Sequence, residues 1–182
     1  MKRWFSTVLA VMLFSGLLIY TLVYDRQGDT GKKNESPVIL SLDISEIKKI
    51  TLAGPKVSIM LERDGSGPEG RGWRITTPGD YPADDFKAED LASALAGLEA
   101  LKTIEGGMES LSSFGLDRPA VSAEVTKADG STGTILLGSK TPLEDGEQSY
   151  YAMEKGGAVV YTISSRVADL LLLDNLSEWR RN

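Results

Sequence analysis

The stretch FKAEDLASALAGLEAL, residues 86–101, decides the fold of this chain. Asp84 or Asp85 offers an N-cap ahead of it, and acidic residues near its start suit the helix dipole. Because a helix with one apolar face must bury that face, we expect it to pack against a β-sheet. Its apolar residues recur at intervals of three and four positions, the spacing of one helical face: Leu91, Ala94, Leu95, Leu98 and Leu101.

The residues before this helix predict three strands. IKKITL (47–52) and VSIMLER (57–63) are strand-like runs, and the turn-forming AGPK between them predicts a hairpin. WRITT (73–77) is the third strand, and alternation places Trp73 and Ile75 on the same face. The first half of the domain is therefore expected to be strands followed by a helix.

The residues after the helix predict two further hairpins. VSAEVTK (121–127) and TILL (134–137) flank an Asp-Gly turn, which is a strong hairpin signal. SYYAME (149–154) and AVVYTI (158–163) flank a pair of glycines. The second half therefore repeats the order of the first, although the two halves share no convincing residue-level repeat.

Shorter elements complete the pattern. Residues 102–105 predict a short strand and residues 108–113 one helical turn. Ser164 or Ser165 caps a final helix, whose inward side chains are Val167, Leu170, Leu171 and Leu173. The order strands, helix, strands, helix predicts an α+β fold, in which two helices pack on an antiparallel sheet.

An apolar N-terminal segment predicts a membrane anchor. Residues 4–24 form an uncharged, proline-free run of 21 residues, which at 1.5 Å per residue matches a hydrocarbon core of about 30 Å. Trp4 at one end and Tyr20 and Tyr24 at the other suit the two membrane interfaces. We therefore expect residues 1–24 to be a single transmembrane helix.

A cleaved signal peptide is the alternative to this anchor. Cleavage needs a shorter apolar core and small residues just before the cut, but Leu22 and Tyr24 at the end of the run are bulky. Lys2 and Arg3 favour a cytoplasmic N-terminus. We therefore expect a single-pass protein of the cell membrane, with its C-terminal domain extracytoplasmic.

The remaining chain divides into a linker and one domain. Residues 25–36 (DRQGDTGKKNES) contain no apolar residue, which predicts a flexible linker. Residues 37–182 are the length of one ordinary domain. We expect them to form the whole α+β domain.

Composition excludes several kinds of chemistry. The chain has no histidine and no cysteine, so it lacks a Ser-His-Asp triad, a thiolate nucleophile and the usual zinc ligands. Its formal net charge of −6 opposes binding to phosphate backbones. We therefore expect no enzymatic activity, catalytic residue, cofactor, metal site or nucleic-acid partner.

Three tyrosines are the candidate site residues. Tyr150, Tyr151 and Tyr161 fall on neighbouring strands of one predicted hairpin. They could form an aromatic surface that binds a partner, a glycan or a small ligand. The other interpretation is that they pack across strands and fill the core.

Several motifs, taken in order, resemble the family called domain of unknown function 4340. They are LERDG (61–65), GWRITTP (72–78), PADDFKAEDLASALAGLEAL (82–101), FGLDRP (114–119), ADGSTGTILLGSKTP (128–142), YYAM (150–153), VYTI (160–163) and the ending LSEWRR (176–181). The resemblance spans about residues 41–181.

The resemblance implies an envelope component with an N-terminal membrane helix. Genes of this family often lie beside those of ABC-2-type transporters and their gliding-motility-like auxiliary subunits. An accessory or interaction module is therefore expected, with a partner such as an ABC transporter subunit. The family has no described catalytic residues to assign here. The alternative is an envelope domain that binds a glycan or small ligand through the three tyrosines.

Overall fold

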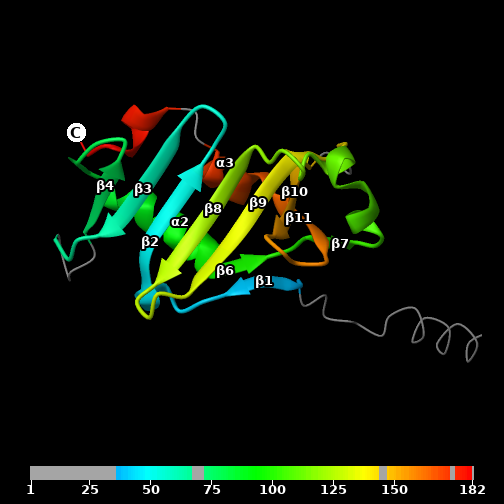
Figure 1. The fold of residues 1–182 in the computed structure, drawn as a ribbon, viewed down its shortest axis with the longest axis horizontal. Coiled ribbons are helices and arrows are strands. Elements are labelled where there is room, and N and C mark those ends of the chain that lie inside the picture. The colour runs from blue at the N-terminus through cyan, green and yellow to red at the C-terminus, as the bar shows by residue number, and fades with distance from the viewer. Residues whose placement is uncertain (1–35, 67–71, 144–146, 173–174, 182) are drawn as a thin grey trace, which may run out of the picture. The chain divides into compact units, whose positions relative to one another are not determined.

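An antiparallel sheet forms the centre of the fold in the computed structural model (Figure 1). The structure describes residues 36–66, 72–143, 147–172 and 175–181, which belong to the compact unit Ser36–Asn182. In this part of the chain, nine strands follow the order β5-β4-β3-β2-β8-β9-β10-β11-β7. Their bounds are β2 Ile47–Ala53, β3 Ser58–Arg63, β4 Trp73–Thr77, β5 Tyr81–Pro82, β7 Lys102–Ile104, β8 Val121–Lys127, β9 Thr132–Lys140, β10 Ser149–Glu154 and β11 Val160–Ser164.

Two α-helices cover one face of this sheet. They are α2 (Asp85–Ala96) and α3 (Ser165–Leu171), both behind the strands in Figure 1. A separate two-stranded sheet pairs β1 (Val38–Ser41) with β6 (Gly97–Glu99). Short 3₁₀ helices are η1 (Ile44–Glu46), η3 (Gly107–Phe114) and η4 (Leu176–Trp179). The predicted α+β class, with an antiparallel sheet and two packed helices, is confirmed.

The predicted membrane anchor and all but the last residue of the predicted linker, Ser36, lie outside the described residues. Among the helices that the structure does describe, none is both long and apolar enough to cross a bilayer.

The sheet is built from two halves with the same order of elements. Strands β2, β3, β4 and β5 precede α2, and strands β8, β9, β10 and β11 precede α3. The first strands of the two halves pair antiparallel at the centre, with Ile50 opposite Val125 and Leu52 opposite Ala123. An approximate two-fold axis normal to the sheet therefore relates the halves. This relation explains why both helices lie on the same face.

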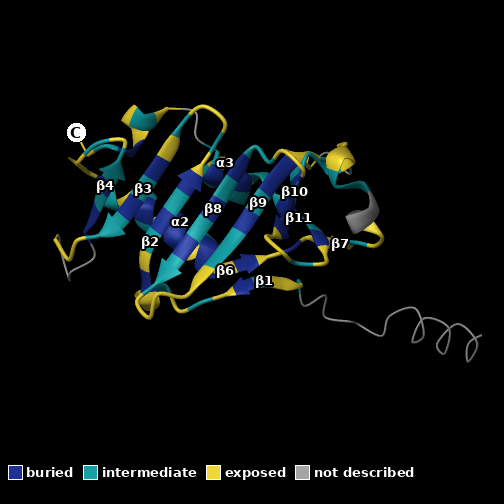
Figure 2. Ribbon diagram, in the orientation of Figure 1, coloured by how far each residue is buried: buried dark blue, intermediate teal, exposed yellow. Residues whose placement is uncertain are grey.

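The main core lies between the sheet and the two helices. Residues along β2, β8 and β9 alternate between buried and partly exposed (Figure 2), as expected for an antiparallel sheet with one covered face. Burial of each large aliphatic side chain contributes about 1.5–3 kcal/mol relative to exposure. The fully buried aliphatic side chains on the covered face include Ile50, Leu52, Ile59, Leu61, Ile75, Val125, Ile135 and Leu137, and the helices contribute Leu91, Leu95, Ala168 and Leu171.

Most of the predicted elements match the structure closely. The strand predicted over residues 73–77 has the bounds of β4, and all three predicted hairpins are present. Asp84 caps α2 by accepting hydrogen bonds from the backbone N–H groups of Phe86 (3.0 Å) and Lys87 (3.2 Å). Ser164 caps α3 through the Val167 N–H at 3.4 Å. Leu173, predicted to face inward on the last helix, lies outside the described residues.

The predicted length of the first helix was wrong. It ends at Ala96, because Gly97 caps it and the chain turns to pair with β1, a strand that was not predicted. Leu98 is buried in β6 rather than on a helical face, and Leu101 is 51% exposed beyond that strand. The leucine spacing continues past Gly97, but pairing with β1 determines the conformation there.

The turn between β8 and β9 gives a pH-dependent prediction. The Asp129 carboxylate accepts hydrogen bonds from the Ser131 hydroxyl (2.6 Å) and the Ser131 N–H (2.8 Å), which hold the pKa of Asp129 below its usual range. A carboxyl group whose pKa is lowered by folding stabilises the protein at pH values above its unfolded-state pKa of about 3.9. This stability is lost as the pH falls through the folded-state pKa.

We therefore expect Asp129→Asn, which keeps the amide oxygen as an acceptor but cannot titrate, to lose less stability below about pH 4 than the natural chain. Urea unfolding at pH 6, 4 and 3 measures this difference. The asparagine variant is expected to have the lower midpoint at pH 6, and the two midpoints are expected to converge toward pH 3. Midpoints that fall in parallel toward pH 3 would show that Asp129 contributes nothing to the acid response.

Candidate functional site

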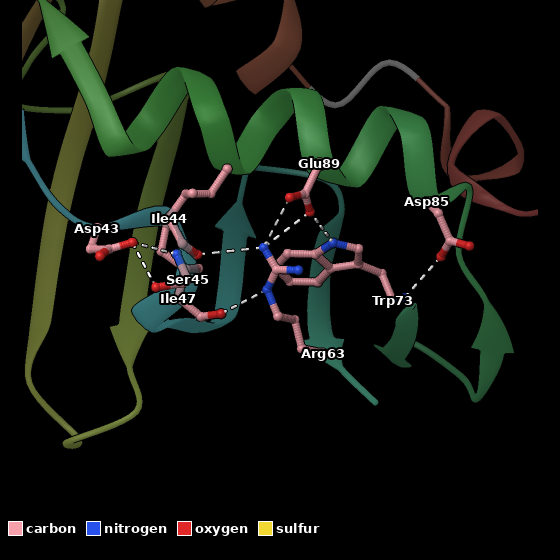
Figure 3. A network of polar contacts seen from close by, with 8 residues as sticks. All are labelled: Asp43, Ile44, Ser45, Ile47, Arg63, Trp73, Asp85 and Glu89. Carbon is pink, nitrogen blue, oxygen red and sulfur yellow. Dashed lines mark hydrogen bonds and ion pairs between the residues drawn. The ribbon is translucent and has the colours of Figure 1, made fainter. Parts of the chain in front are cut away.

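A connected polar network lies between the sheet and the first half of α2 (Figure 3). The Arg63 guanidinium pairs with the Glu89 carboxylate at 3.0 Å and donates from Nε to the Ile47 carbonyl at 3.0 Å. The Trp73 indole N–H donates to Glu89 Oε2 at 2.9 Å, and the guanidinium lies 4.5 Å from the centre of the Trp73 ring. The charges in this network are matched within it, so we assign it to stability.

The chain's last described residues extend this network. The backbone N–H of Asp84 donates to the Trp179 carbonyl at 2.9 Å, and Arg181 forms an ion pair with Asp85. Asp85 also accepts the backbone N–H of Trp73 at 2.9 Å. The buried Trp179 therefore docks the η4 segment beside the first turn of α2.

A smaller apolar cluster lies on the other face of the sheet. Leu116, Met153 and Val160 are its buried members, and Phe114 packs its ring on Tyr151 with centroids 4.6 Å apart. Gly138 on β9 allows the backbone at Phe114 to lie close against the strand, because an added Cβ would overlap the Phe114 carbonyl oxygen. FGLDRP, LLGSK and YYAM, three separate motifs in the sequence, therefore meet at this cluster.

A cleft opens beside this cluster, near the edge strand β7. Its volume is about 280 Å³, slightly below the range of about 300–1,000 Å³ for sites that enclose drug-sized ligands. Residues at the start of β7, on and before β10, on β11 and after β9 converge on it. Its described lining is Leu101, Lys102, Thr141, Pro142, Glu147, Ser149, Tyr151 and Thr162.

Hydrogen bonds join Thr141 to Ser149 and Gln148 in the wall of the cleft. The Thr141 and Ser149 hydroxyls lie 2.8 Å apart, and the Thr141 N–H donates to the Ser149 carbonyl at 2.9 Å. The Gln148 side-chain amide donates to the Thr141 carbonyl at 2.8 Å. These bonds fix the two walls of the cleft and engage the Thr141 and Ser149 hydroxyls within the protein.

The start of the described chain lies beside this cleft. The Ala100 N–H donates to the Pro37 carbonyl at 2.8 Å, and the Leu101 N–H donates to the Thr162 carbonyl at 2.8 Å. Residues 100 and 101 thus connect the first described residues to the cleft lining. Among the described residues, no group of three or more Asp, Glu, His or Cys side chains is placed to hold a metal ion.

The three predicted tyrosines do not share one surface. Tyr150 is 5% exposed and belongs to the main core under the helices, whereas Tyr151 points to the opposite face and lines the cleft. Tyr161 is half-buried and lies opposite Ala152, so it shares the face of Tyr150. Only Tyr151 of the three lies at the cleft.

Sequence reasoning missed most of the cleft. Leu101 was assigned to a helical face. The sequence around the other lining residues matches no known binding or catalytic motif; these are Thr141, Ser149 and Thr162. The convergence of FGLDRP, LLGSKTP and YYAM was the available signal. Using it required knowing that η3 folds back over β9 and β10.

The fold and cleft define a class: small α+β domains with one antiparallel sheet, two helices on one face and a partly apolar cleft near the sheet edge. The chain belongs to the family described as Domain of unknown function (DUF4340), whose model matches residues 73–182. This match confirms the resemblance seen in the motifs. Comparisons with curated proteins and with solved structures found no match.

Proposed function

We propose that this chain is a membrane-tethered extracytoplasmic interaction module, accessory to an ABC-type transporter or another envelope complex. The observation that carries the proposal is the position of the cleft beside Pro37, where the domain follows the predicted linker. Residues 1–24 would anchor the chain with the N-terminus in the cytoplasm. Twelve linker residues reach about 40 Å when fully extended, so the cleft stays within reach of a partner in the membrane.

The chemistry of the cleft supports binding rather than catalysis. The Thr141 and Ser149 hydroxyls are paired with each other, and Glu147 and Lys102 are the charged residues of the described lining. A catalytic base or nucleophile needs a partner that activates it and a position facing the substrate. We therefore propose a non-enzymatic role, without a cofactor or nucleic-acid partner.

Site-specific photo-cross-linking in native membranes tests this function. A benzophenone amino acid at Leu101 is expected to cross-link the chain to a transporter subunit. The same group at Phe86, which is 87% exposed on α2, serves as the control and is expected to give at least tenfold less product. If the chain with the probe at Leu101 is recovered without a cross-linked partner, or if both positions give equal amounts of cross-linked product, the proposal is contradicted.

A small ligand or glycan is the second candidate, and one observation favours it: Tyr151 lines the cleft. The other two tyrosines serve poorly as probes, because truncating the buried Tyr150 would also remove core packing. Tyr151→Phe isolates the hydroxyl while keeping the ring on Phe114. If this variant binds a glycan array as the natural chain does, the Tyr151 hydroxyl has no role in glycan binding.

A further inference from the structure

Exposed apolar residues gather at the end of the domain where the described chain begins. Among the described residues, six large hydrophobic side chains are exposed, and three of them lie at this end: Val38 (56%), Leu101 (51%) and Leu143 (69%). The exposed prolines Pro37 and Pro142 adjoin them in the chain. We call these five residues the apolar patch. Exposed hydrophobic side chains scattered singly need no explanation, but a group of them marks a contact surface.

Contacts within the domain bring the members of the apolar patch together. The Ala100 N–H donates to the Pro37 carbonyl at 2.8 Å, one residue before Leu101. Leu101 and Pro142 line the same cleft, and Leu143 follows Pro142 in the chain. The apolar patch therefore extends from the first described residues to the mouth of the cleft.

The apolar patch also begins at the residue that follows the predicted linker. Residues 25–36 connect Pro37 to the predicted transmembrane helix, and a flexible chain of twelve residues spans about 20 Å on average. Such a tether would make contact between this end of the domain and the bilayer intramolecular, at an effective concentration on the order of millimolar. A few apolar side chains are then enough to hold the domain at the membrane.

The charged residues around the apolar patch carry both signs. Glu99 and Glu147 are exposed, and so are Lys102 and Lys140. Selective binding of anionic lipids needs a cluster of lysines and arginines without interspersed acids, which the described residues at this end do not form. Contact with a bilayer would therefore depend on burying the apolar side chains at the boundary between head groups and acyl chains.

We infer, on the basis of the membrane anchor in the proposed function, that the apolar patch rests on the bilayer, with Val38, Leu101 and Leu143 inserted at the lipid interface. Proximity to the anchor selects lipid over a second copy of the chain, because every anchored chain has the bilayer beside it at all times. The cleft then opens at the level of the head groups. A membrane-embedded partner would meet it there.

The absence of cysteine from the chain makes a single fluorescent label possible. Leu143→Cys, labelled with nitrobenzoxadiazole, is studied as the full chain in phosphatidylcholine nanodiscs that hold one chain each. Lipid with a doxyl group near its head group quenches a label in the interface, and iodide quenches a label in water. We expect doxyl lipid to quench this label at least threefold more strongly than the same label on Phe86→Cys, a site 87% exposed on α2. Iodide is expected to give the reverse order.

Two variants of the chain labelled at position 143 locate the contact. Val38→Thr combined with Leu101→Ser is expected to lower doxyl quenching at least twofold, because it removes two of the apolar side chains. Phe86→Ser is expected to leave the quenching unchanged. All three sites are exposed, so neither variant removes core packing. Equal quenching at the two label sites, or equal losses in the two variants, would overturn the inference.

Other outcomes identify other occupants. Quenching that appears only when anionic phosphatidylglycerol is added would assign the contact to charge. Protection from iodide without doxyl quenching would place protein on the apolar patch, and protection only in discs with two chains would place a second copy there. Each of these results overturns the inference.

The same nanodiscs separate this inference from the proposed function. They contain no transporter, so a failure of doxyl quenching leaves the cross-link from Leu101 in native membranes as an independent test. Doxyl quenching without that cross-link would uphold the bilayer contact and contradict the function. A chain that does not enter the discs would overturn the anchor and, with it, both proposals.

Discussion

Trp73→Ala is expected to lower the free energy of unfolding by about 4 kcal/mol, the usual cost of deleting a buried tryptophan ring. Trp73 is 1% exposed and packs in the core between the sheet and α2. Its loss opens a cavity and removes the surface on which the Arg63 guanidinium lies. It also removes the indole N–H from the Glu89 carboxylate. Urea unfolding of the full chain in nanodiscs, followed by far-UV circular dichroism, measures the change.

Trp73→Phe separates packing from hydrogen bonding. Phenylalanine retains most of the ring but cannot donate to Glu89, and loss of a hydrogen bond to a charged group costs about 1.5–3 kcal/mol. We therefore expect the phenylalanine variant to lie between the natural chain and Trp73→Ala. An equal loss in both variants would mean that the ring contributes little and that the Glu89 bond accounts for the whole effect.

The sequence predicted local structure well because local signals and the final packing agreed. Alternation along residues 73–77 matched burial in β4, and Asp84 and Ser164 capped the helices where a capping residue preceded an apolar run. The turn glycines and Asp129 marked the hairpins. In each case the interactions that decide the conformation lie within a few residues of one another.

The long-range features were harder to predict for the same reason. The helix prediction failed after Gly97, since the partner that makes residues 97–99 a strand is β1, more than fifty residues earlier. The tyrosines were grouped by sequence, whereas the strand pleat separates Tyr151 from Tyr150 and sends it to the cleft. The cleft is formed by four segments that are separate in the sequence, and the residue types of no single segment indicate a binding site.

The same long-range packing makes Gly138 critical. An added Cβ there would overlap the Phe114 carbonyl oxygen and lie 3.1 Å from Leu116 Cγ. A backbone carbonyl cannot rotate away as a side chain can, so the segment after η3 must move off β9. We expect Gly138→Ala to lower the free energy of unfolding by about 3 kcal/mol, the upper part of the usual cost of overpacking.

Gly133→Ala on the same strand is the matched control. A Cβ at Gly133 meets only the end of the Leu40 side chain, at 3.4 Å, which is ordinary van der Waals contact. We expect it to change stability by less than about 1 kcal/mol. Urea unfolding of the two variants gives the comparison, and similar losses for both would refute the packing argument.

Displacement of Phe114 also predicts an effect on the cleft. Phe114 supports the Tyr151 ring, and the Leu116 N–H donates to the Leu111 carbonyl at 2.9 Å to hold η3 closed. In Gly138→Ala, the amide of Leu116 is therefore expected to exchange its hydrogen faster than in Gly133→Ala, under conditions where both variants remain folded. Faster exchange would connect FGLDRP to the cleft through the packing of Phe114 on Tyr151. Equal exchange in the two variants would contradict this connection.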